Sequence, residues 1–399
     1  MHNVKRFLIL LIVALAVGAA SFFTRATLSA AVVKVPDPTK VVMIVDRDSN
    51  DIAFMDIASK QIVGRTFLGN NVNPHMVMMS PDGRYVVTGG TRANKAYVID
   101  ARTLELVKVI PVDIAPEHLA FSPDSRWYYQ GNPEGDSISV IDMLSLTKIK
   151  TIPGLVEPLN TVFLPDGSKA YVGNYGAHWV GVIDVRRHEL LKKIQVGDVP
   201  GVAKLDPDKY LGEIQGINIP QITNDGRYLY ATDTDLGVVA KIDPREDKVE
   251  KVIRVGKNPW RPYMSHDGKY LITPNNGDQT ISIVDLRTDK VAATLEAGEN
   301  MTGVNFAAGK AFVISSTSGF VYVYDMNSLR PAGRMKIGTN IQLETATTDT
   351  KDEKLYLADS TENAVVIIDA KTQQFEKVMN VGLFPWGTHI MDSKDNYCH

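Results

Sequence analysis

The chain has 399 residues, and its 43 Lys and Arg against 46 Asp and Glu side chains give a formal net charge of −3. A slightly acidic chain does not hold a phosphate backbone through bulk charge, which makes a nucleic-acid-binding function unlikely on composition alone. The only cysteine is Cys398. This excludes an intramolecular disulfide, and because there is no Cys-x-x-Cys-His motif, a covalently attached c-type heme is excluded as well.

The first 31 residues have the composition of a secretory signal peptide. Lys5 and Arg6 precede an apolar run from 7 to 20, and small residues follow at Ser29-Ala30-Ala31. The alternative is an uncleaved membrane anchor. Either way, residues 32–399 are expected outside the cytoplasm as a single domain. Without residues 1–31 the chain keeps 40 basic and 46 acidic side chains, a net charge of about −6.

Residues 73–112 contain the pattern that organises the rest of the chain. Four short apolar or β-branched runs are predicted to be strands, and turn signals separate them. The first turn is Pro81-Asp82-Gly83, in which Pro presets φ, Asp bonds the local backbone and Gly supplies a positive φ. The third strand ends at Asp100, whose carboxylate is expected to accept backbone N–H groups of the next turn. The unit is therefore predicted to be a four-stranded antiparallel sheet.

The aspartate that ends the third strand recurs along the whole chain. The intervals between successive markers are 44, 42, 42, 59, 42, 40 and 44 residues, and the markers are Asp56, Asp100, Asp142, Asp184, Asp243, Asp285, Asp325 and Asp369. A four-stranded unit that repeats every 40–45 residues is typical of a β-propeller. Because the aspartates recur at one position in every unit, they are predicted to be turn caps and not a carboxylate site.

Eight markers accompany only seven complete units, because the first unit lacks its innermost strand. Residues 384–392 at the other end of the chain align with the inner strand that begins at Asn73. The sequence therefore predicts an all-β fold, an eight-bladed β-propeller of four-stranded antiparallel blades closed by pairing of a C-terminal strand with the first blade. Closure removes the exposed sheet edges that an open array would leave.

The 59-residue interval contains an insertion, Asp198 to Glu213, between a fourth strand and the next first strand. In this topology the insertion lies on the face where inner strands begin and where the loops between second and third strands lie. We call it the funnel face, and we call the opposite face, which carries the Pro-Asp-Gly type turns, the turn face. Insertions in repeat proteins tend to fall on the binding face. A tolerated surface loop is the alternative.

Polar and aromatic residues that open the inner strands are the candidate site. Cofactor-binding candidates are His75, His118, Trp260, Arg261, Trp386 and His389, and His75 and His389 are the metal candidates. Converging histidines could ligate a metal or a heme iron, or act as acid and base. Alternatively, each could fill its repeat position and bond water or a carbonyl group. An aromatic ring with a cation could stack on a flat ligand or be buried against the next blade.

Three other histidines and the two terminal residues receive different expectations. His178, in a loop between second and third strands, could also approach the funnel mouth. His266 replaces the proline of a turn and is predicted to be structural, whereas His188 lies in a turn and is predicted to be solvated. The terminal Cys398-His399 pair could be a metal ligand pair, an intermolecular disulfide or a frayed tail.

The repeat resembles a known family. Ser80-Pro81-Asp82-Gly83-Arg84-Tyr85-Val86, the segment 97–103 and endings such as Ile194-Gln195-Val196-Gly197 are similar to the YVTN β-propeller repeat. The eight-blade count and the closure through Trp386-Gly387 resemble the cytochrome d1 heme domain group, which includes a periplasmic propeller of heme d1 biosynthesis. The resemblance implies a periplasmic propeller that holds a tetrapyrrole over its central face with His75 near the iron. The missing c-type heme motif departs from the nitrite reductases of that group.

Three functions are compatible with these features. The first is a periplasmic accessory propeller that binds a cofactor or small ligand, such as a non-covalent heme or a metal, on the funnel face. The second is a non-enzymatic interaction module, or a subunit of a periplasmic redox complex, whose partner would be a periplasmic redox or maturation protein. The third is a secreted metal-dependent enzyme. The repeat alone does not separate them, because one fold serves many functions.

Overall fold

The computed structural model describes residues 33–196, 206, 209–212 and 214–395. The predicted signal peptide, most of the insertion and the Cys398-His399 pair lie outside these residues. In the described part of the chain no helix has the length and apolarity needed to cross a membrane.

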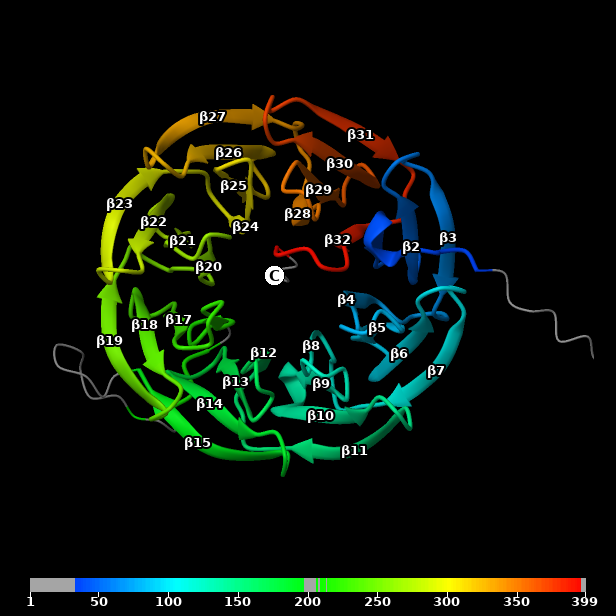
Figure 1. Ribbon diagram of the computed structural model, residues 1–399, viewed down its shortest axis with the longest axis horizontal. Coiled ribbons are helices and arrows are strands. Elements are labelled where there is room, and N and C mark those ends of the chain that lie inside the picture. Colours follow the sequence, from blue (N-terminus) through cyan, green and yellow to red (C-terminus); the bar gives the residue numbers. More distant parts are fainter. Residues whose placement is uncertain (1–32, 197–205, 207–208, 213, 396–399) are drawn as a thin grey trace, which may run out of the picture. The chain divides into compact units, whose positions relative to one another are not determined.

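Eight four-stranded antiparallel sheets form the blades of a ring (Figure 1). The strands of each blade are given from the inner to the outer one. Blade 1 consists of β32 (Pro385–His389), β1 (Val41–Asp46), β2 (Asp51–Asp56) and β3 (Ile62–Phe67), and blade 2 of β4 (Pro74–Met79), β5 (Tyr85–Gly90), β6 (Lys95–Asp100) and β7 (Leu106–Pro111). Blade 3 consists of β8 (His118–Phe121), β9 (Trp127–Asn132), β10 (Ser137–Asp142) and β11 (Thr147–Ile152), and blade 4 of β12 (Pro158–Phe163), β13 (Lys169–Asn174), β14 (Trp179–Asp184) and β15 (Glu189–Gln195).

Blades 5 to 8 follow the same order. Blade 5 consists of β16 (Gln221–Ile222), β17 (Leu229–Asp233), β18 (Val238–Asp243) and β19 (Lys248–Arg254), and blade 6 of β20 (Tyr263–Met264), β21 (Tyr270–Asn275), β22 (Thr280–Asp285) and β23 (Lys290–Glu296). Blade 7 consists of β24 (Met301–Ala307), β25 (Lys310–Ser315), β26 (Phe320–Asp325) and β27 (Arg330–Lys336), and blade 8 of β28 (Leu343–Thr348), β29 (Lys354–Asp359), β30 (Ala364–Asp369) and β31 (Phe375–Met379). Two short 3₁₀ turns, η1 (Pro38–Lys40) and η2 (Pro133–Gly135), complete the described elements.

The ring closes between the two ends of the chain, as predicted. Strand β32 pairs antiparallel with β1, with Met43 opposite His389 and Val45 opposite Gly387. Blade 1 therefore takes its inner strand from the C-terminus and its other three from the N-terminal end of the fold. The eight-bladed, closed propeller is confirmed.

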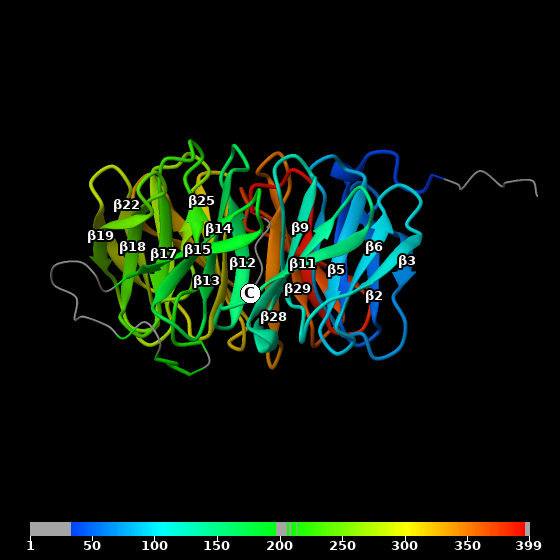
Figure 2. The ribbon, with the colours of Figure 1, turned by 90° about the horizontal axis from the view of Figure 1, so that it is seen from below.

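The hydrophobic core lies between neighbouring blades. Inner and middle strands are buried along almost their whole length, whereas outer strands such as β3 alternate between exposed and partly buried residues. Between blades 1 and 2, for example, Met43 and Phe54 pack in one cluster with Val86 and Tyr97. Each blade covers its neighbour, as expected of a repeat fold that cannot bury its faces one unit at a time. Figure 2 shows the blades from the side, with loops at both faces.

The marker aspartates cap turns, as predicted. The Asp100 carboxylate accepts the backbone N–H groups of Arg102 and Thr103 at 3.0 and 2.8 Å. The same arrangement recurs at Asp285 and Asp369. These carboxylates belong to the repeat and not to a site.

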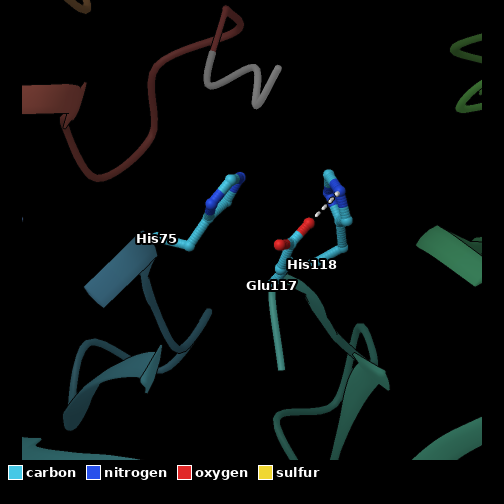
Figure 3. A group of neighbouring side chains, drawn as sticks. All are labelled: His75, Glu117 and His118. Carbon is cyan, nitrogen blue, oxygen red and sulfur yellow. Dashed lines mark ion pairs between the residues drawn. The ribbon is translucent and has the colours of Figure 1, made fainter. Parts of the chain in front are cut away.

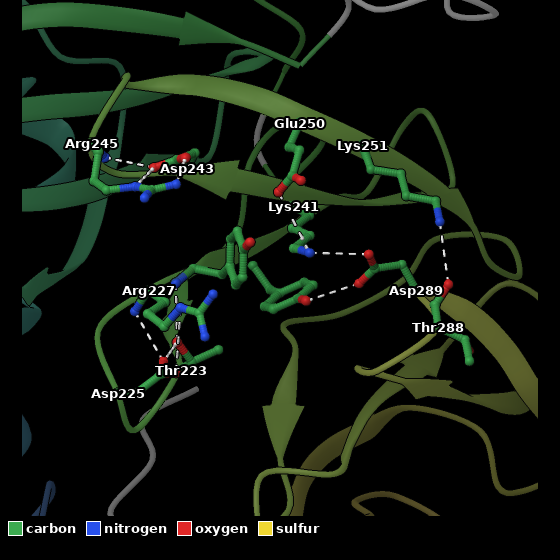
Figure 4. A network of polar contacts seen from close by, with 12 residues as sticks. Thr223, Asp225, Arg227, Lys241, Asp243, Arg245, Glu250, Lys251, Thr288 and Asp289 are labelled. Atoms are coloured by element: carbon green, nitrogen blue, oxygen red, sulfur yellow. Dashed lines mark hydrogen bonds and ion pairs between the residues drawn. The ribbon is translucent and has the colours of Figure 1, made fainter.

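Tyrosines on second strands bond to the next blade. Tyr171 donates to Asp247 at 2.6 Å, and Tyr230 donates to Asp289 at 3.1 Å. Lys241 pairs with the same Asp289 carboxylate at 3.0 Å (Figure 4). These bonds join the turn between the third and fourth strands of one blade to the blade before it.

His188 occupies the same turn position in blade 4, so the prediction that it is solvated is wrong. Its side chain is buried, its Nδ1 lies 2.7 Å from the hydroxyl of Tyr129, and its ring packs on Trp127. Like Asp247 and Asp289, it has a positive φ, which the tight turn requires. Burial, with a smaller contribution from Lys150, lowers the pKa of His188. The histidine is a neutral partner of a neighbouring tyrosine.

His266 holds the end of the described chain on the turn face, which agrees with the predicted structural role. Its Nε2 lies 2.8 Å from Asp395, and its Nδ1 lies 3.2 Å from Asp352. Asp395 is fully buried and also accepts the Phe306 N–H at 2.6 Å and the Thr348 hydroxyl at 2.8 Å. Residues 390–395 are thus fixed across several inner-strand ends.

The His266 ion pairs predict a pH-dependent stability. Burial alone would lower the pKa of His266, but the hydrogen bonds and charges of Asp395 and Asp352 raise it above its ordinary value. This stabilisation is complete below the unfolded value of about 6.5 and is lost as the pH rises through the raised folded pKa. We expect His266→Gln to lower the free energy of unfolding by about 2 kcal/mol in mild acid. The difference from the wild type should shrink in alkali, as thermal denaturation across pH would measure. A difference that stays constant with pH would contradict the charged pair.

Candidate functional site

Three potential ligand side chains meet on the funnel face between blades 2 and 3 (Figure 3). His75 is the second residue of β4, His118 is the first residue of β8, and Glu117 directly precedes it. We call these three residues the funnel cluster. One potential ligand atom of each residue lies within 4.8 Å of the others. The His118 Nε2 is 3.8 Å from the Glu117 carboxylate, and the two imidazole rings meet edge to face with centroids 5.5 Å apart.

The cluster depends on close packing of the two blades. A side chain at Gly89 of β5 would place its Cβ 2.6 Å from the Pro116 carbonyl oxygen, immediately before Glu117. The Glu117 N–H in turn bonds the Gly131 carbonyl at 3.2 Å, which ties the segment to its own blade. The absence of a side chain at Gly89 therefore lets the start of β8 approach blade 2 and brings Glu117 and His118 toward His75.

Gly89→Ala is predicted to disturb the funnel cluster from outside it. The new methyl group would meet backbone, which cannot rotate away, so the Pro116–His118 segment must shift. We expect a loss of about 1–3 kcal/mol of stability, as urea denaturation would measure. Any ligand held jointly by His75 and His118 should also bind more weakly. Thr88→Ala is the matched control, since it alters the preceding residue of the same strand without adding bulk. Unchanged stability and ligand affinity in Gly89→Ala would contradict this packing.

Burial and neighbouring charges tune the Glu117 carboxyl. Burial raises the pKa of Glu117 to about 7, Arg47 opposes this shift, and Glu134 adds to it. A carboxyl with this pKa can exchange a proton for a metal ion near neutral pH, since a ligating carboxylate must be deprotonated. The two histidines of the funnel cluster are buried, whereas the Glu117 side chain is partly exposed.

An arginine and two aromatic rings border the cluster on the blade 1 side. The ring of Trp386 lies 5.5 Å from that of His75 and stacks on Phe384 at 6.0 Å. The Arg47 guanidinium sits 4.2 Å above the Trp386 ring and donates to the Asn73 amide oxygen at 2.8 Å. Burial lowers the pKa of Arg47, while Glu117 and Glu344 oppose that shift. The C-terminal strand therefore supplies a wall of the site as well as the closure of the ring.

Of the six predicted site residues, three lie in or beside the cluster and three do not. His75 and His118 belong to the cluster, and Trp386 packs on His75. His389 is at the far end of β32, where its Nε2 accepts the Met79 N–H at 3.4 Å, and burial lowers its pKa to about 3. The structure thus separates the predicted metal pair of His75 and His389, because His75 is the second residue of β4, whereas His389 contacts Met79, the last residue of that strand.

Trp260 and Arg261 open the sixth blade, in another part of the funnel face. The Trp260 ring lies 5.9 Å from that of Tyr175, and the Arg261 guanidinium lies 5.3 Å from the ring of Tyr263 in the wall of its blade. His178 also lies apart from the cluster, and its Nδ1 is 2.7 Å from the fully buried Asp233. These residues border the funnel without joining the three ligands.

A groove of about 550 Å³ begins at Glu117 and runs toward blade 4. Its walls include Glu134 and Asp136 of the β9–β10 loop and Tyr210 of the insertion. Leu211 N bonds the Gly176 carbonyl at 2.9 Å, which places the described part of the insertion against a funnel-face loop, as predicted. The insertion therefore builds part of a groove that opens onto a potential metal ligand.

Two histidines and one carboxylate form a recognised metal-binding set. Catalytic zinc sites use two histidines and a glutamate and keep a position open for water or substrate. The same set with open positions on one side holds iron(II) in oxygenases. The donors of the funnel cluster come from one side of the funnel, so a bound ion would keep coordination positions open.

Comparisons with known proteins place the fold among known β-propellers. A family model described as YNCE-like beta-propeller matches residues 47–209. Among solved structures, dihydro-heme d1 dehydrogenase NirN in complex with DHE is similar, with 18% identity and a TM-score of 0.72, covering 92% of this chain and 78% of that one.

Two further solved structures are similar. Kuenenia stuttgartiensis hydrazine synthase matches with 22% identity and a TM-score of 0.56, over 76% of this chain and 97% of that one. A functionally unknown protein from Desulfotomaculum acetoxidans DSM 771 matches with 11% identity and a TM-score of 0.55, over 88% and 98% of the two chains. No curated protein matches the sequence. The family match covers less than half of the chain and NirN is 18% identical, so these comparisons support the β-propeller fold.

Proposed function

We propose that the protein is a periplasmic accessory propeller whose funnel cluster binds a divalent transition-metal ion through His75, Glu117 and His118. The observation that carries this proposal is that one potential ligand atom from each residue lies within 4.8 Å of the other two. Ligands around zinc or a similar ion lie about 2.0–2.2 Å from the metal, so modest side-chain rotations would bring all three into contact with one ion. Open positions would then accept water or a small ligand from the groove.

The composition of the cluster favours a bare ion over a heme iron. A tetrapyrrole occupies four coordination positions of its iron and leaves two axial positions on opposite sides of the ring. Three donors gathered on one side would leave at least one of them unused. A divalent ion uses both imidazoles and the carboxylate, and it compensates the negative charge that Glu117 carries when deprotonated.

A tetrapyrrole held by His75 alone is the second candidate. It is supported by the similarity of the fold to NirN in its complex with DHE and by the aromatic pair of Trp386 and Phe384 beside His75. An aromatic wall next to an axial histidine would suit a flat macrocycle. In this case Glu117 and His118 would be neighbours of the cofactor and not ligands of its iron.

Two features support the proposed accessory role and periplasmic location, the predicted signal peptide and the similarity of the fold to known propellers. The predicted signal peptide would export the chain, and the similar structures include NirN and hydrazine synthase. A periplasmic redox or maturation protein remains the partner that we propose. The funnel face, which carries both the cluster and the groove, is where such a partner would deliver or collect the ligand.

Titration with two probes tests the proposal. Chelator-stripped protein should bind about one Co²⁺ per chain. The visible bands of coordinated Co²⁺ should appear in the wild type and disappear in His75→Ala and in Glu117→Gln. Hemin, added separately, should give no His75-dependent Soret shift. A Soret shift that needs His75 but not Glu117, without saturable Co²⁺ binding, would overturn the metal proposal in favour of the tetrapyrrole. Failure of both probes to bind would contradict both candidates.

A further inference from the structure

We infer that the groove beside Glu117 binds an organic cation, of the size of a protonated aryl or alkyl amine. The inference rests on the proposed function in one respect only, which is that the organic cation would lie next to a bound metal ion. The groove volume of about 550 Å³ falls within the range of small-molecule sites. Its lining combines carboxylates, phenol rings and apolar side chains, and the described residues that form it include no Lys, Arg or His.

Negative charge is concentrated along the groove. Four carboxyl side chains contribute to its lining, which are Glu117, Glu134, Asp136 and Glu157. Within the described ranges, Glu134, Asp136 and Glu157 form no ion pair with a basic side chain. A cation that enters the groove would offset the negative charge of these carboxylates.

The carboxylates are too widely spread to hold a small inorganic ion together. In the part of the chain that the structure describes, the funnel cluster is the one group of three or more ligand residues close enough to share an ion. Glu134, Asp136 and Glu157 do not form a second such group. Carboxylates spread around a partly apolar groove suit a larger organic cation better than a metal ion.

Two tyrosines provide surfaces for the cation. Tyr175 comes from the β13–β14 loop and Tyr210 from the insertion, and both line the groove together with Leu159 and Ile214. The Tyr210 hydroxyl donates to Glu157 at 2.7 Å, so an aromatic ring and a carboxylate are held side by side. Ammonium groups bind favourably over aromatic faces, and apolar walls suit the hydrocarbon part of an amine.

The insertion places the aromatic wall. Gln215 N and Gly216 N both bond the Tyr175 carbonyl, at 3.1 and 2.6 Å, and anchor the segment that directly follows the insertion to the loop that carries Tyr175. The regular blades have no equivalent of Tyr210, because the insertion occurs at a single interval of the repeat. The groove is therefore a specific addition to the propeller and not a recurring gap between blades.

Binding of benzylammonium, measured by calorimetry on the full chain, tests the inference. Benzyl alcohol has a similar shape without the charge, and we expect it to bind at least about tenfold more weakly. Glu157→Gln keeps a side-chain oxygen for the Tyr210 hydroxyl and removes only the charge. Both Glu157→Gln and Tyr210→Ala should weaken benzylammonium binding about tenfold. Glu353→Gln, an exposed carboxylate paired with Lys371 outside the groove lining, is the matched control and should bind as the wild type does.

The outcomes separate this inference from the proposed metal site. Equal binding of benzylammonium and benzyl alcohol, no binding of benzylammonium, or equal losses in Glu353→Gln and Glu157→Gln would each overturn the organic-cation groove. Metal stoichiometry is determined independently on the same wild-type sample. A metal-free protein that still selects benzylammonium through Glu157 would contradict the metal proposal and support the groove.

Discussion

Replacing His118 with alanine is expected to lower the affinity for a divalent transition metal by at least about 100-fold. The estimate is conservative, because loss of residues that only orient metal ligands already costs about 10–100-fold. His118 is buried, so water would have to enter a narrow space to replace the lost nitrogen. Isothermal titration of chelator-stripped protein with Zn²⁺ would measure the change.

Two further variants make the His118 result specific. Glu117→Gln keeps an oxygen at the cluster but removes its charge, so it should weaken metal binding less than His118→Ala does. His389→Gln changes a buried histidine at the other end of the inner strands and should leave the metal affinity unchanged. Thermal denaturation of each variant checks that it is folded. Loss of metal in His389→Gln, with retention in His118→Ala, would contradict the assignment of the funnel cluster.

Removal of β32 is expected to abolish folding of the propeller. A chain that ends at Phe384 would leave the edge of β1 unpaired and remove Ile390 from a core cluster that includes Val42 and Ile44. It would also remove Asp395 and its contacts to three inner-strand ends. Each fully buried large aliphatic side chain contributes about 1.5–3 kcal/mol, and a whole domain is stable by only about 5–15 kcal/mol.

A matched truncation isolates the contribution of β32. A chain that ends at Asp395 keeps the strand, the His266 ion pair and the core contacts of Ile390. Circular dichroism and gel filtration should show native β-structure for this chain and aggregation for the shorter one, because an unpaired edge recruits other chains. A soluble, cooperatively melting chain that ends at Phe384 would contradict the account of ring closure. The chain that ends at Asp395 also lacks Cys398 and His399, so its metal content tests whether that pair is a ligand.

The repeat was sufficient to predict the fold because each blade carries the same local signals. The aspartate at the end of the third strand and the turn after the first set the period, and both perform the predicted roles in the structure. The missing first strand and the alignment of residues 384–392 with the start of β4 predicted the closure. Short-range turn chemistry and a repeated apolar pattern therefore determine the architecture.

The candidate site was only partly predictable from the same alignment. Pro385 and Pro74 begin equivalent strands, so Trp386 and not His389 occupies the position of His75. His389 lies three residues after Trp386 in its strand and therefore far from the position of His75, and this difference in strand position can be read from the sequence. Glu117 gave no signal beyond its place next to His118. Its approach depends on the contact between Gly89 and Pro116, which only the packing of two blades reveals.

The prediction that His188 is solvated failed for a different reason. A histidine in a turn is usually solvated, but the turn between the third and fourth strands reaches the tyrosine of the preceding blade. The partner is 59 residues away in the chain, because the second strand of one blade contacts the turn after the third strand of the next blade. His188 is buried by a contact between neighbouring blades, and the sequence of a single repeat does not predict such a contact.

Anomalous diffraction from crystals loaded with Zn²⁺ tests the central claim most directly. We expect a single strong anomalous peak at the zinc edge, about 2.0–2.2 Å from one nitrogen of His75, one nitrogen of His118 and a carboxylate oxygen of Glu117. Crystals of His118→Ala should lack this peak. A zinc peak elsewhere, with none at the funnel cluster, would contradict the account.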